Sequence, residues 1–247
     1  MRVTFLGTGS ALAGGDRVQT GLLIDGEDAG PLLVDCGAGV LQSLTQTAVG
    51  YAGIETVLLT HLHVDHVSDL FAILKARWLA GEPATEIVGP PGTESFLETM
   101  LSAYDYLREK LELSVREIGP SEFDCAGFRI DAVQTVHSIT TYAYRLDDGE
   151  CVLTISSDTE ASDAVMDLAD GSSLLIHDCS FPDSVDVANH PTPTQLGDVL
   201  AGHPIDTIVL THLYPHTNGE HEAMRKAVGD AFDGDVLIAH DGMMLDV

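Results

Sequence analysis

Three histidines and one aspartate fall within six positions of the run Thr60-His-Leu-His-Val-Asp-His66. Imidazole nitrogen and carboxylate oxygen are the ligands that zinc prefers in proteins. One closed site could be filled by these four side chains alone, His61, His63, Asp65 and His66. If further ligands come from elsewhere in the chain, there are more ligands than one site can hold, and this excess of ligands points to two metal ions. A solvated surface is the alternative, and this spacing disfavours it.

The segments on either side of the run explain how its side chains can converge. Before it, Thr56–Leu59 is an apolar stretch typical of a buried strand. After it, apolar residues recur at helical spacing between Val67 and Trp78. The run is therefore predicted to lie on a strand-to-helix loop, where neighbouring side chains can reach one point.

Further ligands must also come from the ends of strands. Two metal ions about 3.5–4 Å apart need about six or seven protein ligands. Three candidates follow predicted strands over residues 128–133, 152–156 and 207–211, namely His137, Asp158 and His212. Together with the histidine run they supply the required number.

Strand and helix patterns alternate from one end of the chain to the other. The predicted strands are Val3–Leu6, Thr20–Ile24, Pro31–Asp35, Thr56–Thr60, Glu86–Val88, Phe128–Val133, Tyr142–Arg145, Val152–Ser156, Ser173–His177, Thr207–Thr211 and Asp235–Ala239. The predicted helices are Val40–Thr47, Val67–Trp78, Gly92–Tyr104, Ser162–Leu168, Pro193–Ala201 and Glu220–Val228. No linker or low-complexity tract divides the 247 residues, which predicts one domain over residues 1–247.

The two halves of the chain echo each other weakly. Glu55–Leu62 resembles Asp206–Leu213, and Leu32–Cys36 resembles Leu174–Cys179. A duplication would give two packed, pseudo-symmetric halves with His61 and His212 at equivalent strand ends. The alternative is chance recurrence of an apolar strand followed by Thr-His.

The charge balance is strongly acidic, with 39 Asp and Glu against 11 Lys and Arg and a net charge of −28. Such a surface repels itself in dilute buffer and is screened at high salt, where the Debye length is about 3 Å at 1 M. Because the acids are spread along the whole chain, we predict adaptation to a salty cytoplasm, as in halophilic archaea. A partner with a basic surface is the alternative. A long nucleic acid is disfavoured, because it would need a broad basic patch.

Other features predict a cytoplasmic protein. The sequence contains no run of about 18 apolar residues, so no membrane-spanning helix is expected. Met1–Gly7 has the pattern of a strand rather than of a signal peptide. The four cysteines form no CxxC pair, which is typical of reduced thiols in the cytoplasm: Cys36, Cys125, Cys151 and Cys179.

These motifs together resemble the metallo-β-lactamase superfamily, and most of all its ribonuclease Z branch. The resemblance extends over nearly the whole chain, through Val3–Ala11, Leu33–Gly37, the histidine run, His137, Ser157–Thr159, His190–Pro193, Leu210–His212 and Ala239–Met243. It implies an α/β fold, a four-layer αββα sandwich, with a dinuclear site at the edge between the sheets. It also implies a metal-dependent hydrolase and is compatible with a homodimer.

The resemblance implies a role for each site residue. One metal ion would be held by His61, His63 and His137, the second by Asp65, His66 and His212, with Asp158 bridging the two. Asp65 would also orient or deprotonate the attacking water, and His190 would be a general acid at the leaving group. Asp35 would orient a metal-binding imidazole. The ions would be Zn²⁺, with Mn²⁺ as the alternative, because nitrogen and oxygen ligands do not choose between them.

Simpler roles are open for several of these residues. Asp35 could cap a turn, and His190 could be an ordinary loop histidine. His177 precedes Asp178 where the branch often has a histidine followed by an acid, and His240 ends the last predicted strand, where it would face the site. Surface or hydrogen-bonded roles are favoured for His203, His216 and His221.

One departure from the ribonuclease Z pattern bears on the substrate. In that branch a long arm that grips tRNA lies between the counterparts of His137 and Asp158, but here only 20 residues separate them. They suffice for a hairpin over Thr141–Arg145 and Val152–Ser156. The sequence therefore predicts a phosphodiesterase for a small or cyclic phosphodiester or an RNA end, with a small-molecule or short nucleotide substrate. Processing of tRNA 3′ ends is a disfavoured alternative.

Other activities of the same fold give competing hypotheses. A lactone, thioester or sulfate ester hydrolase would keep the same metal run. A diiron oxidoreductase is disfavoured, since it would typically have an acid in place of His63. A non-catalytic binding module would tend to lose Asp65 or Asp158, and both are present.

Overall fold

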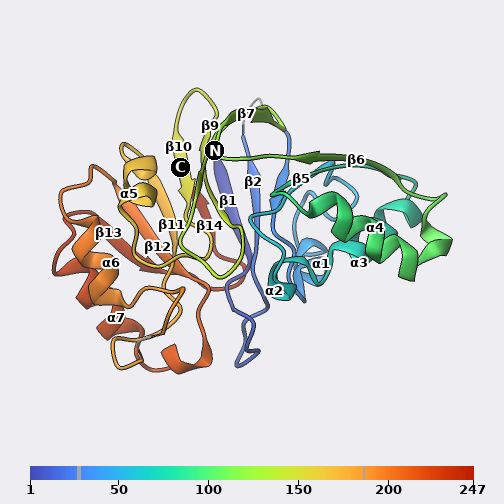
Figure 1. The fold of residues 1–247 in the computed structure, drawn as a ribbon. Coiled ribbons are helices and arrows are strands. Elements are labelled where there is room, and N and C mark those ends of the chain that lie inside the picture. The colour runs from blue at the N-terminus through green and yellow to red at the C-terminus, as the bar shows by residue number, and fades with distance from the viewer. Residues whose placement is uncertain (27–28, 186) are drawn as a thin grey trace.

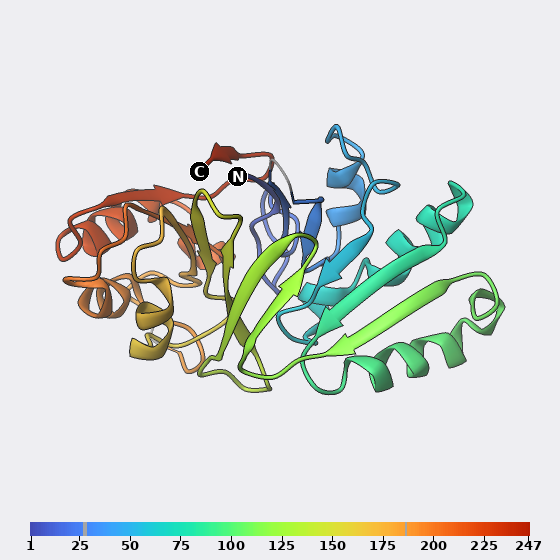
Figure 2. The same cartoon turned by 90° about the horizontal axis from the view of Figure 1, so that it is seen from above.

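The computed structural model describes residues 1–26, 29–185 and 187–247. Two seven-stranded sheets face each other at the centre, and helices cover both outer surfaces (Figures 1 and 2). This four-layer αββα sandwich confirms the predicted fold. The two ends of the chain meet at one side of the molecule, where the Met1 amino group lies 3.3 Å from the Val247 carbonyl oxygen.

The first sheet comes from the N-terminal half and one C-terminal strand. Its strands are, in spatial order, β14 (Met244–Asp246), β1 (Arg2–Gly7), β2 (Gly21–Asp25), β3 (Leu32–Val34), β4 (Thr56–Leu58), β5 (Ala84–Gly89) and β6 (Glu112–Glu117). The helices that follow these strands are α1 (Val40–Leu44), α2 (Val64–Val67), α3 (Leu70–Leu79) and α4 (Thr93–Ala103), with a 3₁₀ turn at Asp105–Leu107.

The second sheet comes from the rest of the chain. Its strands are, in spatial order, β7 (Glu122–Cys125), β8 (Phe128–Gln134), β9 (Tyr142–Asp147), β10 (Val152–Ile155), β11 (Leu174–Asp178), β12 (Thr207–Thr211) and β13 (Asp235–Ile238). Its helices are α5 (Asp163–Ala169), α6 (Pro193–Leu200) and α7 (His221–Gly229), with a 3₁₀ turn at Pro215–Thr217. Figure 1 shows α5, α6 and α7 on the side opposite α1, α3 and α4.

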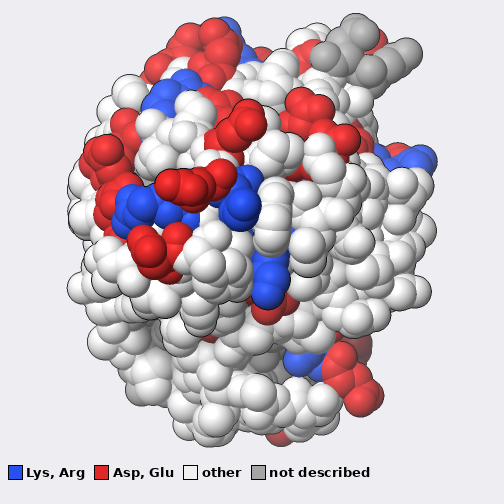
Figure 3. Space-filling view, turned by 90° about the vertical axis from the view of Figure 1, so that its right-hand side faces the viewer, with Lys and Arg blue, Asp and Glu red and all other residues white. Residues whose placement is uncertain are grey.

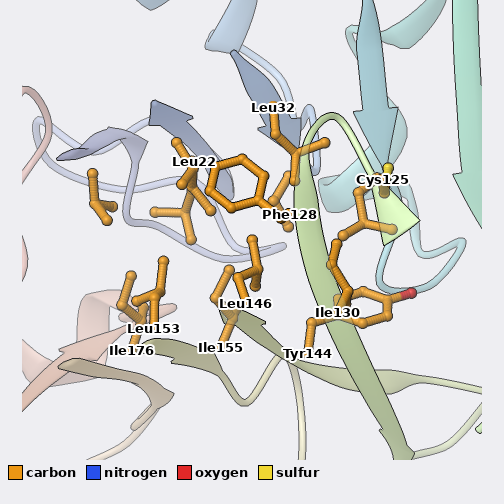
Figure 4. Packing of buried hydrophobic residues seen from close by; sticks show 14 of the residues in the cluster. Leu22, Leu32, Cys125, Phe128, Ile130, Tyr144, Leu146, Leu153, Ile155 and Ile176 are labelled. Carbon is orange, nitrogen blue, oxygen red and sulfur yellow. The ribbon is translucent and has the colours of Figure 1, made fainter. Parts of the chain in front are cut away.

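Apolar side chains fill the three spaces between the four layers. Between the sheets, Leu22 and Leu32 of the first sheet face Phe128, Leu146 and Ile155 of the second (Figure 4). A second cluster joins the first sheet to α1, α3 and α4, and a third joins the second sheet to α5, α6 and α7. Strands buried on both faces read as continuous apolar runs, which is why β3, β4 and β12 were predictable.

The two sheets share one order of strand pairings. From β14 to β6, and equally from β7 to β13, three antiparallel pairings are followed by three parallel ones. In this order β4 corresponds to β11, and β12 corresponds to β5. The predicted placement of His61 and His212 at equivalent strand ends is therefore wrong, because their strands occupy different positions in the two sheets.

Three strands and one helix break were not predicted. β6, β7 and β14 all lie at sheet edges and carry charged residues, so their apolar signal is weak. The single helix predicted over Val67–Trp78 is two helices, α2 and α3, and α2 includes the second half of the histidine run. At the break, the Asp69 amide donates to the Cys36 carbonyl oxygen at 2.9 Å instead of to a helical carbonyl, and the Asp69 carboxylate accepts from the amides of Gly39 and Leu41 at 2.9 Å.

Two further expectations meet the structure here. The hairpin predicted between His137 and Asp158 is formed by β9 and β10, and those strands pair directly. Within residues 1–26, 29–185 and 187–247, none of the helices combines the length and apolar character needed to cross a bilayer. On the face in Figure 3, basic side chains lie beside acidic ones. The ion pairs of the chain include Arg108–Glu98 at 2.9 Å and Arg116–Glu86 at 3.3 Å.

Candidate metal centre

The predicted site residues converge where strands of the two sheets end. β3 to β6 run parallel to one another, as do β10 to β13, so within each set the carboxyl ends lie at one edge. Asp35, His61, Asp158 and His212 follow β3, β4, β10 and β12. His137 enters from the connection between β8 and β9. The carboxyl ends of parallel strands are the usual place for ligand sites in open α/β sheets.

The first cluster consists of three histidines and one carboxylate oxygen. His63 Nδ1 lies 3.1 Å from His61 Nε2 and 3.2 Å from His137 Nε2. Asp158 Oδ2 lies 3.8 Å from His61 Nε2 and 3.7 Å from His137 Nε2. The four side chains predicted for the first ion and the bridge thus surround one point.

The second cluster lies on the other side of Asp158. His212 Nε2 is 3.4 Å from His66 Nε2 and 3.3 Å from Asp65 Oδ2. The other oxygen of the Asp158 carboxylate, Oδ1, lies 3.4 Å from His66 Nε2. Asp158 therefore faces both clusters.

The spacing and chemistry of these atoms fit divalent cations. Zinc–nitrogen bonds of about 2.0–2.1 Å in a tetrahedron place neighbouring ligand atoms about 3.3 Å apart, close to the separations in both clusters. In the first cluster one nitrogen of each imidazole faces the other two, and the second nitrogen of each ring has a partner elsewhere. When each neutral ring carries its hydrogen on that second nitrogen, three lone pairs face one point, and a cation there satisfies all of them. The chain therefore has a divalent metal site of imidazole and carboxylate ligands.

Asp35 orients two of the histidines, one from each cluster. Its Oδ2 lies 2.7 Å from His66 Nδ1, and the same oxygen accepts a hydrogen bond from Thr60 Oγ1 at 2.7 Å. Thr60 Oγ1 is in turn 3.0 Å from His61 Nδ1. The backbone amide of Thr60 donates to the other carboxylate oxygen at 2.8 Å. Asp35 is 1% exposed, so these contacts are shielded from solvent.

Asp178 makes a similar set of contacts at the other side of the site. Its Oδ2 lies 2.7 Å from His190 Nδ1, and its Oδ1 accepts from Ser180 Oγ at 2.6 Å. Ser180 Oγ is 2.9 Å from His212 Nδ1. Sequence reasoning did not assign Asp178 or Ser180 to the site. The available signal was their position at the carboxyl end of a predicted strand, like that of Asp158 and His212.

Burial favours the neutral form of the three histidines in the first cluster. It lowers the pKa of His61, His63 and His137, and the neighbouring histidines lower the pKa of His61 further. Metal ions bind neutral imidazole, so this direction favours occupancy. Burial opposes the charged form of Asp158, but His212 and His66 outweigh it and hold the pKa of that carboxyl well below its usual range.

His190 has the opposite behaviour. Burial opposes its charged form, but the adjacent Asp178 carboxylate outweighs this effect and raises the pKa of His190 to about 9. Its Nδ1 is committed to Asp178, so Nε2 is the atom that faces the cluster, close to Asp158 and His212. His190 therefore holds a proton at neutral pH beside the candidate ligands.

The backbone is unusual at this site. Asp35, Ser157, Asn189 and His212 have positive φ angles of 58°, 55°, 73° and 59°. Left-handed backbone is uncommon for residues other than glycine, and it concentrates at functional sites where the surrounding structure enforces it. Here it turns the chain sharply at a residue of the site or at the residue just before one.

A pocket of about 320 Å³ opens over the two clusters. Besides candidate ligands, its described walls are Ala11, Val64, Ser138, Asn189, His190 and Tyr214. None of these wall residues is Lys or Arg. Tyr214 stacks on Phe181 with ring centres 4.5 Å apart, and burial, together with nearby carboxylates, raises its pKa to about 12.

The other histidines lie outside the pocket walls. His177 is fully buried, and its Nδ1 lies 2.7 Å from the carbonyl oxygen of Asp178. His240 is exposed and does not line the pocket, so the expectation that it faces the site is wrong. The remaining three have the surface or hydrogen-bonded roles that were predicted: His203 contacts Asp170 at 2.7 Å, His221 contacts Thr217 at 3.4 Å, and His216 is exposed.

Known proteins resemble this chain over almost its whole length. A family profile described as "Anti-Pycsar protein Apyc1" matches residues 1–229. Ribonuclease Z of Mycobacterium bovis (strain BCG / Pasteur 1173P2) is 30% identical over 271 residues, which cover 98% of this chain and 96% of the relative. The metallo-β-lactamase fold protein YhfI from Bacillus subtilis has a TM-score of 0.85 and 26% identity, covering 99% of this chain and 98% of its own. Human tRNase Z, short form (ELAC1), shares the fold with a TM-score of 0.81 and 23% identity, covering 100% and 99%.

Proposed function

The chain belongs to the family described as Anti-Pycsar protein Apyc1, within the ribonuclease Z-like branch of the metallo-β-lactamase superfamily, and we propose that it is a phosphodiesterase with two divalent metal ions. Its substrate is a small or cyclic phosphodiester or an RNA end. The observation that carries this proposal is the pair of ligand clusters joined by Asp158, with His190 beside them and its Nδ1 2.7 Å from Asp178 Oδ2.

Each cluster has a place in the proposed reaction. His61, His63 and His137 would hold one ion, Asp65, His66 and His212 the other, and Asp158 would bridge them. When bound, two such ions lower the pKa of a water held between them and neutralise phosphoryl oxygens. Asp65, whose Oδ2 lies 3.3 Å from His212 Nε2 in the second cluster, would also orient or deprotonate the attacking water.

His190 completes the proposed reaction at the leaving oxygen. Asp178 holds its Nδ1 hydrogen, so the transferable proton is on Nε2, which faces the pocket. Proton donation to the leaving oxygen matters most when the leaving group is a poor one, such as an alkoxide of ribose. A pKa of about 9 keeps this proton in place at neutral pH.

The pocket walls favour a small substrate with one phosphate. A volume of about 320 Å³ lies near the low end of the range of about 300–1,000 Å³ for ligand pockets. His190 is the one cationic wall residue among those described, and Ser138, Asn189 and Tyr214 are neutral hydrogen-bonding groups. Long nucleic acids are bound mainly by Lys and Arg on many phosphates. A cyclic mononucleotide or another short phosphodiester therefore suits these walls better than a whole tRNA.

Turnover of a chromogenic phosphodiester in molar KCl tests the proposal. Metal-free protein would be supplied with Zn²⁺ or Mn²⁺, with a chelator as control, and then offered cyclic mononucleotides and a tRNA precursor. We expect metal-dependent cleavage of the small diesters and none of the tRNA precursor. Cleavage of the precursor alone would favour tRNA 3′ processing. Folded, metal-loaded protein without any phosphodiesterase activity would overturn the proposal in favour of lactone, thioester or sulfate ester hydrolysis.

A further inference from the structure

Ser180 occupies a position that the proposed metal chemistry does not yet explain. It lies two residues beyond the end of β11, and none of its side chain reaches solvent. Its hydroxyl contacts Asp178 Oδ1 at 2.6 Å, His212 Nδ1 at 2.9 Å and the carbonyl oxygen of His212 at 3.0 Å. It also lies 3.2 Å from His190 Nδ1.

The single hydroxyl hydrogen decides which way these bonds run. A serine hydroxyl has one hydrogen to donate and two lone pairs that accept. The shortest contact is with the Asp178 carboxylate, so the hydrogen points there, and hydrogen bonds to ionised acceptors are the stronger ones. A lone pair of Ser180 then accepts from His212 Nδ1–H. This leaves the lone pair of His212 on Nε2.

His212 Nε2 is the atom that the second cluster needs. It lies 3.3 Å from Asp65 Oδ2 and 3.4 Å from His66 Nε2, among the proposed ligands of the second ion. The other tautomer would carry a hydrogen on Nε2 and could not bind a metal there. The choice between tautomers therefore depends on the bond between Ser180 and His212.

Ser180 acts on one cluster only. The histidines of the first cluster have other partners: Thr60 Oγ1 for His61 at 3.0 Å, Ser138 Oγ for His63 at 3.4 Å and the Asn189 carbonyl oxygen for His137 at 3.4 Å. In the second cluster His66 is held by Asp35 at 2.7 Å. His212 is thus the one candidate ligand whose imidazole is oriented by Ser180.

We propose that Ser180 is a positioning residue for the second metal ion, selecting the His212 tautomer that binds through Nε2. Thr60 is its counterpart for the first ion, through His61. This inference rests on the proposed metal ligands, but not on the substrate. Metal binding can therefore support it even if the chain hydrolyses no phosphodiester.

Stepwise binding of Zn²⁺ by metal-free protein, in competition with a chromophoric chelator, tests the proposal. Loss of a residue that orients a metal ligand typically weakens metal affinity about 10–100-fold. We expect Ser180→Ala to weaken one of two equivalents by that factor, and Ser180→Thr, which keeps the hydroxyl, to restore part of it. Thr60→Val is the matched control and should weaken the other equivalent.

A second background identifies which ion is affected. His212→Ala should leave one tight equivalent, and adding Ser180→Ala to it should change nothing further, whereas adding Thr60→Val should weaken that equivalent. Unchanged Zn²⁺ binding in Ser180→Ala, or a weaker remaining site in His212→Ala/Ser180→Ala, would overturn the proposal.

The wild-type chain gives a test that no folding defect can obscure. Nitrogen NMR of the zinc-loaded protein reports which nitrogen of His212 bears the hydrogen. A protonated Nδ1 with metal on Nε2 supports the role of Ser180, and the reverse tautomer contradicts it.

Discussion

Two groups of hydrogen bonds on opposite sides of the site are built alike but serve different histidines. In the first group, Asp35 contacts His66 directly at 2.7 Å and reaches His61 through the hydroxyl of Thr60. In the second, Asp178 contacts His190 directly at 2.7 Å and reaches His212 through Ser180. Each group is one buried aspartate, one hydroxyl and two imidazoles.

The difference lies in what the directly held histidine does. His66 is 1% exposed, and both histidines of the first group, His61 and His66, are proposed metal ligands. His190 has a side chain that is 11% exposed and lies in the pocket wall, outside the proposed ligand set. In the proposed site, the same arrangement would therefore serve a ligand of each ion on one side, and on the other a ligand and the proposed proton donor.

The carboxylate that both clusters share should give the largest effect. Asp158→Ala removes a proposed ligand of both ions, whose joint stabilisation of the transition state is worth several kcal/mol. We expect activity to fall about 10⁴-fold and both metal equivalents to weaken. Metal content and turnover measure this, with the exposed Asp198→Ala as control. A variant that keeps both ions and normal turnover would remove Asp158 from the site.

His190→Gln separates the proton donor from the ligands. We expect a loss of about 10²–10⁴-fold with a diester whose leaving group is an alkoxide, because general acids contribute about that much. The loss should be much smaller with p-nitrophenolate, which leaves without a proton. Metal content should remain unchanged. Equal losses for both leaving groups would contradict the role of general acid.

Asp35→Asn and Asp178→Asn compare the two groups directly. Removing a partner that orients metal ligands weakens metal binding about 10–100-fold. Asp35→Asn should therefore weaken both Zn²⁺ equivalents, since Asp35 serves His61 and His66. Asp178→Asn should weaken the second equivalent alone. Identical binding curves for the two variants would mean that the groups do not differ in the way the contacts indicate.

The pH dependence sharpens the same contrast. A general acid must be protonated, so activity should fall as the pH rises through the His190 pKa of about 9. Because Asp178 raises that pKa, Asp178→Asn should move the alkaline fall in rate toward the ordinary histidine range near 6.5. A pH–rate profile of both proteins measures the shift. If the alkaline fall in rate stays at the same pH in Asp178→Asn, deprotonation of His190 is not its cause.

Salt should change the stability of the protein through its surface charges, and not through either group of buried hydrogen bonds. Both aspartates are buried, whereas the net charge of −28 is carried by acids along the whole chain. We expect the melting temperature of the wild type to rise from dilute buffer to molar KCl as repulsion is screened. The Asp35→Asn and Asp178→Asn variants should show the same rise. Full stability in dilute buffer would contradict adaptation to a salty cytoplasm.

The layers and the candidate ligands were predictable from sequence because their signals are local. Apolar strands that end in Thr60-His61 or Thr211-His212 combine burial and ligand chemistry within a few residues. Edge strands such as β6 gave no such signal, since they are half-exposed and charged. Asp178 and Ser180 were missed because their role depends on the direction of hydrogen bonds to His190 and His212, from distant segments.

The internal sequence similarity between the two halves did not predict which strands occupy equivalent positions in the two sheets. The resemblance of Leu32–Cys36 to Leu174–Cys179 aligns Asp35 with Asp178, and that of Glu55–Leu62 to Asp206–Leu213 aligns His61 with His212. These residues do have similar partners. Their strands, however, are displaced by one position between the two sheets. The internal similarity therefore matches residues with similar hydrogen-bond partners, and not strands at equivalent positions in the two sheets.

The left-handed backbone at His212, with φ of 59°, has a consequence for repairing the site. Glycine adopts this conformation freely, so in His212→Gly the main chain would keep its turn without strain. The deletion would leave an imidazole-shaped opening between the Ser180 hydroxyl and the side chains of Asp65 and His66. Free imidazole from solution has the size and the two nitrogens to fill that opening. Because of this turn, free imidazole could take the place of the His212 ring in His212→Gly without any change in the main chain.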